Sequence, residues 1–162
     1  MRYAGSLESV GRTPVIRPHR LAAKGVGLDP EAKAFVSRVV ADESQPVVLF
    51  LLVWCEFCWS VRTLFDRLWV GYRTVNLDSI EYRAGDRGDK IRAALMARVG
   101  APAIPQIFVA GEHVGGAADV FDAFKSGRLQ ELLQHAGVAF NPNPGLDPYS
   151  LLPNWRHPCM RA

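Results

Sequence analysis

Two cysteines, Cys55 and Cys58, are separated by two residues in a C-x-x-C pattern that lets two thiols act together. An apolar, β-prone run at 47–53 comes directly before them, and apolar residues at helical spacing follow. Cys55 therefore lies at a predicted strand-to-helix junction, where unpaired N–H groups and the helix dipole favour a thiolate. Cys58, one helical turn further on, can attack a mixed disulfide formed on Cys55. The pair predicts thiol–disulfide redox chemistry.

The same spacing also fits half of a metal site or a chance pair in a helix. A tetrahedral zinc site needs further ligands, and the sequence has no second C-x-x-C and no His pair nearby. A third cysteine, Cys159, is either another redox thiol that reaches back to the first pair or an idle thiol. His157 lies two residues from it, but two ligands alone rarely hold a metal. We expect no metal site, and the remaining histidines are isolated: His19, His113 and His135.

The composition is that of an ordinary globular chain. Of 162 residues, 49% are hydrophobic and 22% charged, and 19 Lys and Arg against 16 Asp and Glu leave a net charge of +3. These scattered charges give no reason to expect nucleic acid or a membrane surface as a partner. The longest apolar run, at 47–55, is far shorter than the ~20 residues of a membrane-spanning helix. No signal-peptide pattern is present, and three cysteines do not suit a disulfide-stapled secreted domain, so we expect a cytoplasmic protein.

The elements around the cysteines alternate between helix and strand. Asp29 before Pro30 and Glu31 predicts a capped helix start. The predicted elements are a helix ending at 41, a strand at 47–53, a helix ended by Gly71, a strand at 72–77, a helix at 86–99, a strand at 104–109, a hairpin partner at 113–116, and helices at 119–124 and 129–137. This order predicts an α/β protein of the thioredoxin-like fold, with a central four-stranded mixed sheet flanked by helices.

The chain divides into three parts. Residues 1–28 carry Gly and Pro without a period and predict an irregular arm, residues 29–137 form the domain, and residues 138–162 form a Pro-rich tail. The tail is too apolar to float freely, so we expect it to pack on the domain or on a partner subunit through Tyr149, Leu151, Leu152 and Trp155.

The order of these motifs resembles the glutaredoxin family over about 100 residues. The matching segments are Val47-Val48-Leu49-Phe50, Cys55-Glu56-Phe57-Cys58, Val61-Arg62-x-Leu64-Phe65, Val75-x-Leu77-Asp78, Ile91-Arg92-x-x-Leu95, and a block from Gly100 to Asp119 that contains Ile104-Pro105 and Gly115-Gly116. From composition alone, Pro105 at the start of a strand would be an ordinary trans proline. The resemblance instead implies a cis Ile104–Pro105 bond that faces the cysteines.

The resemblance also implies a site for glutathione. The glutathione sulfur would bond to Cys55, and the backbone of Ile104, before Pro105, would pair with the glutathione main chain. The γ-glutamyl end would meet a helix N-terminus, which binds a carboxylate well, and the glycine carboxylate would meet Arg92. The residues implied for the γ-glutamyl end are Ala117, Ala118 and Asp119.

Three departures from the family pattern predict weaker glutathione binding. Leu52 stands where a Lys is usual, a loss on the order of 1 kcal/mol for a partly exposed contact, although Arg62 can partly replace that charge. Ala103 stands where a Thr is usual. Glu56 lies beside Cys55, where an acid either opposes a thiolate or serves as an acid of the first helical turn.

Trp54, directly before Cys55, has two interpretations. It either contacts a substrate or the active-site sulfur, or it packs the loop. Some family members with Trp at this place hold a [2Fe-2S] cluster between two subunits through the first Cys and two glutathiones. Trp59 is expected to pack or to lie at the surface.

The leading hypothesis is a glutathione-dependent thiol–disulfide oxidoreductase. Cys55 would attack protein disulfides or protein–glutathione mixed disulfides, Cys58 would resolve, and glutathione would reduce the pair. The alternatives are an iron–sulfur cluster carrier and a specialised pathway protein whose tail binds its substrate. The expected partners are glutathione and a disulfide-containing or glutathionylated protein, and the oligomeric state is left open.

Overall fold

The structure, a computed structural model, describes residues 27–153 of the chain. The predictions made for residues 1–26 and for Trp155, His157 and Cys159 lie outside the described residues. The described elements are the helices α1 (Pro30–Val40), α2 (Glu56–Arg67), α3 (Arg87–Val99), α4 (Ala117–Ser126) and α5 (Arg128–His135), the strands β1 (Val47–Leu51), β2 (Arg73–Asn76), β3 (Gln106–Val109) and β4 (Glu112–Gly115), and the short 3-10 helices η1 (Ile80–Tyr82), η2 (Ala84–Asp86) and η3 (Pro148–Leu151).

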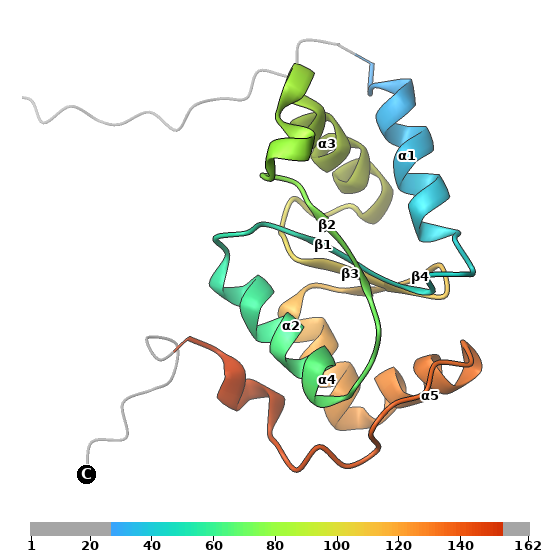
Figure 1. Cartoon of the computed structure of the whole chain (residues 1–162), viewed down its shortest axis with the longest axis vertical. Coiled ribbons are helices and arrows are strands. Elements are labelled where there is room, and N and C mark those ends of the chain that lie inside the picture. The colour runs from blue at the N-terminus through green and yellow to red at the C-terminus, as the bar shows by residue number, and fades with distance from the viewer. Residues whose placement is uncertain (1–26, 154–162) are drawn as a thin grey trace, which may run out of the picture.

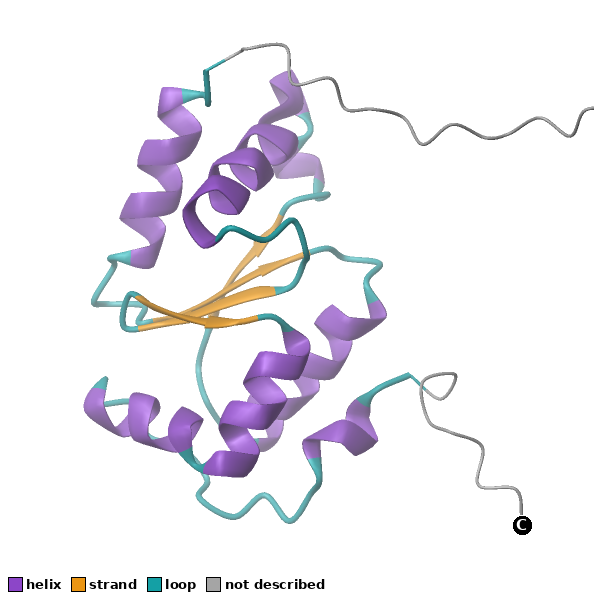
Figure 2. Ribbon diagram, turned by 180° about the vertical axis from the view of Figure 1, so that it is seen from behind, coloured by secondary structure: helices purple, strands orange, loops and turns teal. Residues whose placement is uncertain are grey.

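The strands form one mixed sheet in the order β2-β1-β3-β4. Strand β1 is parallel to β2 and antiparallel to β3, which is antiparallel to β4. Helices α1 and α3 cover one face of this sheet, and α2 and α4 cover the other (Figures 1 and 2). The prediction of a thioredoxin-like α/β fold with a four-stranded mixed sheet is confirmed.

Strand β1 is buried along its whole length, as its continuous apolar run predicts. Because successive side chains of a strand point to opposite faces, β1 contributes to two cores. Leu49 and Leu51 belong to the core beneath α2 and α4, while Val48 and Phe50 belong to the core beneath α1 and α3. The central strand thus joins the two halves of the domain and fixes where α2, which follows it, begins.

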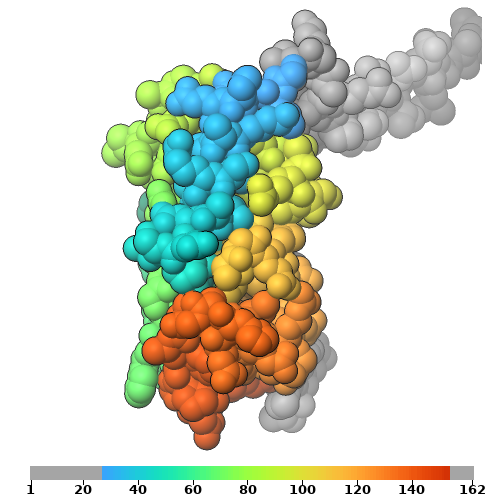
Figure 3. Space-filling view, turned by 90° about the vertical axis from the view of Figure 1, so that its right-hand side faces the viewer, coloured from blue at the N-terminus to red at the C-terminus, as the bar shows by residue number. Residues whose placement is uncertain are grey.

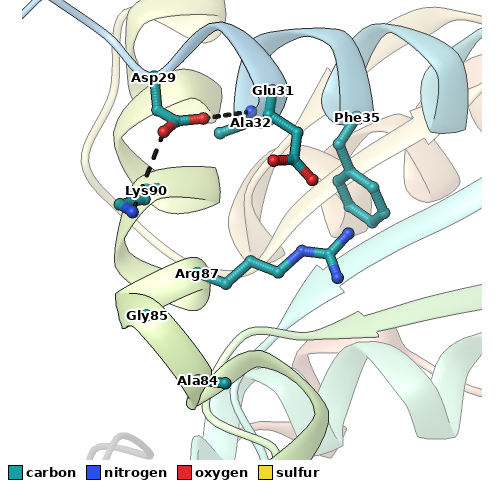
Figure 4. Close-up of a pocket in the computed structure, with 8 residues that line it drawn as sticks. All are labelled: Asp29, Glu31, Ala32, Phe35, Ala84, Gly85, Arg87 and Lys90. Atoms are coloured by element: carbon teal, nitrogen blue, oxygen red, sulfur yellow. Dashed lines mark hydrogen bonds and ion pairs between the residues drawn. The ribbon is translucent and has the colours of Figure 1, made fainter.

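Helix α1 begins as predicted (Figure 4). The Asp29 carboxylate accepts a hydrogen bond from the Ala32 N–H at 2.8 Å and lies 4.0 Å from the Lys90 ammonium of α3. The Arg87 guanidinium lies 5.3 Å from the centroid of the Phe35 ring. These contacts fasten α1 to α3 on the face of the sheet opposite α2, so they support the fold away from the cysteines.

The segment that follows α5 packs on the domain. The Ser60 hydroxyl of α2 donates to the Leu151 carbonyl at 2.6 Å, and the Tyr149 ring meets Phe121 of α4 at 5.5 Å between centroids. Leu151 and Leu152 pack against the core beneath α2 and α4. In Figure 3 the red C-terminal segment and the blue α1 lie at opposite ends of the face shown. Of the two alternatives for the tail, packing on the domain holds for Tyr149, Leu151 and Leu152.

Several boundaries differ from prediction by one or two residues, and the start of α4 shows a local reason. Helix α4 begins at Ala117 rather than 119, because Asp119 lies in its first turn and accepts a hydrogen bond from the Gly116 N–H at 2.8 Å. Two 3-10 turns, η1 and η2, come before α3, in a segment for which no element was predicted. None of the helices described between residues 27 and 153 has the length and apolar character needed to cross a bilayer.

The pairing of the strands brings four chain segments to one end of the sheet. Since β1 and β2 are parallel, their carboxyl ends lie together, and the antiparallel pairings add the start of β3 and the end of β4. The segments that leave or enter the sheet there contain Asp78, Cys55, Ile104-Pro105 and Gly115-Gly116. The topology therefore assembles the predicted site at this end.

Candidate active site

Cys55 is the residue that caps the N-terminus of α2. Its backbone is extended, with φ −94° and ψ 117°, and its side chain makes no capping hydrogen bond to the helix. The sulfur is half-buried and lies 4.0 Å from the Ile104 carbonyl oxygen. This sulfur therefore lies at the start of a helix, where the first N–H groups have no partner within the helix.

Cys58, one turn further along α2, is fully buried. Burial raises the pKa of its thiol to about 12, and neighbouring Cys55 acts in the same direction. The Leu52 N–H, 3.5 Å from the Cys58 sulfur, opposes this shift only in part. At neutral pH Cys58 is therefore a protonated thiol behind Cys55, and Cys55 is the sulfur of the pair that an incoming group can reach.

Glu56 and Phe57, the residues between the two cysteines, form the start of helix α2. Glu56 is an exposed acid in the first turn of α2, where a negative charge is favourable to the helix dipole. Arg62, further along α2, donates to the Asn76 side chain at 2.5 Å and favours the thiolate of Cys58. The charge of Arg62 therefore acts on the buried Cys58. At position 52 itself, the chain has a leucine where a lysine is usual.

The Ile104–Pro105 peptide bond is cis, as the resemblance implied. Pro105 is buried between the active-site end of β3 and the start of α4, since a Cβ added to Gly116 would lie 3.5 Å from the Pro105 carbonyl oxygen. Gly115 has φ +127°, and a Cβ there would collide with the Asp119 side chain. The absence of a Cβ at Gly115 therefore lets the Asp119 side chain, in the first turn of α4, lie against the end of β4.

The first residues of α4 present backbone N–H groups and a carboxylate. Ala117 is buried, whereas Ala118 and Asp119 are exposed. One oxygen of Asp119 is engaged with the Gly116 N–H at 2.8 Å. This end of α4 can hold an anion through its N–H groups, with an acid beside it that suits an ammonium group.

Arg92 lies on α3 at the other side of the cysteine loop. It is exposed, and its guanidinium donates to the Pro102 carbonyl at 3.3 Å. Arg92 and Leu52 line the same pocket of about 430 Å³, together with Asp78 and Asp89. The structure therefore brings Arg92 next to the position that lacks a lysine.

Asp78 has a structural contact that the sequence reasoning missed. Its two carboxylate oxygens lie 2.8 and 3.1 Å from the Val53 N–H, and the Trp59 indole donates to the Val53 carbonyl at 2.9 Å. Val53 is thus held on both sides two residues before Cys55, and β1 ends at Leu51 rather than at 53. The available signal was an acid directly after a strand parallel to β1, because such strands end at the same edge.

Trp54 does not pack the loop, since its side chain is 89% exposed. That interpretation was wrong, and the indole remains available beside Cys55. Trp59 is 59% exposed, in line with a surface position. Among residues 27–153, no group of three or more His, Cys, Asp or Glu side chains is placed to hold a metal ion.

Comparison with known proteins shows which family this chain is similar to. The glutaredoxin family model matches residues 47–114. A chloroplastic glutaredoxin-C4 of Oryza sativa subsp. japonica is 34% identical over 100 residues, which cover 62% of this chain and 71% of that protein. A glutaredoxin of Ricinus communis is 34% identical over 95 residues, which cover 59% of this chain and 88% of that protein.

Solved structures of glutaredoxins have a fold similar to that of this chain. A crystal structure of a buckwheat glutaredoxin–glutathione complex superposes with a TM-score of 0.60 at 32% identity, covering 67% of this chain and 93% of that one. A wheat glutaredoxin superposes with a TM-score of 0.60 at 35% identity, covering 67% of this chain and 98% of that one. The residues matched by the family model, 47–114, contain both cysteines and the cis-proline loop.

Proposed function

This chain belongs to the glutaredoxin family, and from that premise we propose that it is a glutathione-dependent thiol–disulfide oxidoreductase. Its substrates are protein–glutathione mixed disulfides and protein disulfides. Cys55 is the nucleophile, and Cys58 is the resolving thiol for disulfide substrates. The observation that carries this proposal is the contrast between the reachable Cys55 at a helix N-terminus and the buried, protonated Cys58 behind it.

Reduction of a mixed disulfide needs only Cys55. Its thiolate attacks the glutathione sulfur, a Cys55–glutathione disulfide forms, and the protein thiolate leaves. A second glutathione thiolate then attacks the bound glutathione sulfur, so that glutathione disulfide is released and the Cys55 thiolate returns. One free glutathione thiol is oxidised for each mixed disulfide reduced, because the other half of the glutathione disulfide comes from the substrate, and no other reductant is required.

Reduction of a protein disulfide uses both cysteines. After Cys55 has formed a mixed disulfide with the substrate, Cys58 gives up its proton and attacks the Cys55 sulfur, so that a Cys55–Cys58 disulfide forms and the second substrate thiol leaves. Two glutathione thiols then reduce this disulfide in turn, and glutathione disulfide is released. Because the pKa of Cys58 is about 12, its thiolate is scarce at neutral pH. We expect this route to be slower than the mixed-disulfide route.

Glutathione binding is supported by the arrangement around Cys55 and by a structural relative described as a glutaredoxin–glutathione complex. In the proposed site, Ile104 next to Pro105 meets the glutathione backbone, and Arg92 meets the glycine carboxylate. The N-terminus of α4 takes the γ-glutamyl end through Ala117, Ala118 and Asp119. No feature of the described residues favours an iron–sulfur cluster carrier over this activity.

The test is glutathione-coupled reduction of a glutathionylated peptide by the full chain and by three variants. We expect wild type and Cys58→Ser to turn over and Cys55→Ser to be inactive. Cys159→Ser serves as the control for general loss of a thiol, and it should behave as wild type. A protein disulfide substrate should separate the routes, because Cys58→Ser should then lose most of its activity. Turnover that survives Cys55→Ser, or an inactive wild type, would overturn the proposal.

A further inference from the structure

Gln106 is a buried polar residue directly after the cis-proline. It opens β3, is only 2% exposed, and its amide nitrogen donates to the Ala103 carbonyl at 2.9 Å. On the neighbouring strand β4, the His113 imidazole Nε2 lies 2.6 Å from the other end of this amide, Oε1 of Gln106. A continuous chain of two hydrogen bonds therefore runs from β4 to the loop in front of Ile104.

The direction of these hydrogen bonds follows from the last acceptor. A backbone carbonyl can only accept, so the Gln106 nitrogen must face Ala103 and its oxygen must face His113. The proton on the imidazole consequently lies on Nε2, which donates. Burial and Arg98 lower the pKa of His113 and Asp119 opposes this, so the ring has a single N–H to place near neutral pH. The Phe108 ring, 5.0 Å away between centroids, supports the imidazole from β3.

The held carbonyl belongs to the same peptide group as the Ile104 N–H. A trans peptide is planar, and its C=O and N–H point in opposite directions, so fixing the Ala103 carbonyl also aims the Ile104 N–H. Ala103 has no polar side chain with which to fix this loop itself. In the part of the chain that the structure describes, no hydrogen bond uses the Ile104 N–H, and the Ile104 carbonyl lies 4.0 Å from the Cys55 sulfur.

We propose that His113 and Gln106 are positioning residues that set the affinity for glutathione by orienting the Ala103–Ile104 peptide beside Cys55. Neither side chain touches the reacting sulfurs. His113 prevents the Gln106 amide from turning over, and Gln106 keeps the Ile104 N–H directed toward a ligand backbone. The donated hydrogen bond also polarises the peptide and strengthens its N–H as a donor. This inference rests on the proposed function, since the ligand is glutathione.

The test compares two substitutions at one position. His113→Phe keeps a ring against Phe108 but removes the donor, whereas His113→Gln restores an Nε2 donor at similar reach. Glu112→Gln, on the same strand at a residue whose side chain pairs with Arg128, is the control. The measurements are kcat and KM for reduced glutathione in the peptide assay, and the amide resonance of Ile104 in the ¹⁵N–¹H spectrum of the free protein.

We expect His113→Phe to raise KM for glutathione about fivefold, the effect of one net hydrogen bond, with kcat at saturating glutathione changed less than twofold. Its Ile104 resonance should shift before any ligand is added. His113→Gln should restore the wild-type KM and the wild-type Ile104 resonance, and Glu112→Gln should change neither of them.

A wild-type KM in His113→Phe, or an unmoved Ile104 resonance, would overturn the inference while leaving the proposed function intact. A wild type without measurable glutathione turnover would overturn the proposed function, and this inference with it. A loss in His113→Phe that His113→Gln does not recover would also overturn the inference, because a donor restored at this position would then not orient the loop.

Discussion

Asp78 provides the most direct test of how the cysteine loop is held. Its carboxylate accepts from the Val53 N–H through both oxygens, at 2.8 and 3.1 Å, and it is half-buried. A hydrogen bond to a charged group contributes about 1.5–3 kcal/mol, and partial exposure places this one at the lower end. We therefore expect Asp78→Ala to lower the free energy of unfolding by about 1.5 kcal/mol, a fall in Tm of about 5 °C.

The neutral variant separates the hydrogen bond from the charge. Asp78→Asn keeps an oxygen that can accept from Val53, so it should lose less than half as much stability as Asp78→Ala. Asp86→Asn removes a charge from the same pocket at a residue whose side chain makes no capping hydrogen bond, and it should stay within about 0.5 kcal/mol of wild type.

The assays are urea unfolding and glutathione-coupled turnover at a temperature where every variant is folded. Because Val53 comes two residues before Cys55, Asp78→Ala should also slow turnover several-fold while Asp86→Asn does not. If Asp78→Ala has the stability of wild type, or loses no more than Asp86→Asn, then the Val53 contact does not hold the loop and the reasoning fails.

Three other perturbations have defined outcomes. The contribution of Cys58 to the free energy of unfolding should be fully present below about pH 9 and should decrease as the pH rises toward 12. The reason is that the folded chain holds the Cys58 proton more tightly than an ordinary thiol of pKa 9.0 does. In urea unfolding, the free energy of unfolding should fall less between pH 8 and pH 10.5 for Cys58→Ser than for wild type. An equal fall in the two proteins would contradict the burial argument. Trp54→Ala should leave Tm nearly unchanged because the indole is 89% exposed, whereas Trp59→Phe, which loses the donor to Val53, should cost about 1 kcal/mol. A larger loss for Trp54→Ala than for Trp59→Phe would reverse that ranking. Ser60→Ala should cost about 1 kcal/mol and hasten proteolysis within 138–153, since it removes the donor to Leu151. The exposed Ser150→Ala is its control, and equal proteolysis of both variants would show that Ser60 does not anchor the segment.

The elements with strong local signals were predictable. The cap formed by Asp29 and the fully buried β1 depend on contacts within a few residues or on a continuous apolar run, and both were confirmed. The start of α4 was misplaced by two residues because it depends on a single hydrogen bond, from the Gly116 N–H to Asp119. Element boundaries of this kind are decided by one contact that periodicity does not reveal.

The candidate site was predictable only as a set of residues. The spacing of Cys55 and Cys58 indicated a redox pair, and the order of motifs indicated the family and the cis bond at Pro105. The contacts of Asp78, Gln106 and His113 were not found, because each joins segments that are adjacent only after the sheet has formed. His113 in particular was indistinguishable from an isolated surface histidine.

The sequence by itself determined which chemistry this chain can perform. Two thiols at C-x-x-C spacing after a buried strand have few other uses, and local rules of helix and strand formation place them at a helix start. The tertiary structure decided which thiol is reachable, because only the packed domain buries Cys58 and raises its pKa to about 12. It also decided that Trp54 lies open beside Cys55 and that the Ile104 peptide is held from β4. Burial and long-range hydrogen bonds depend on strand order, and strand order exists only when the chain has folded.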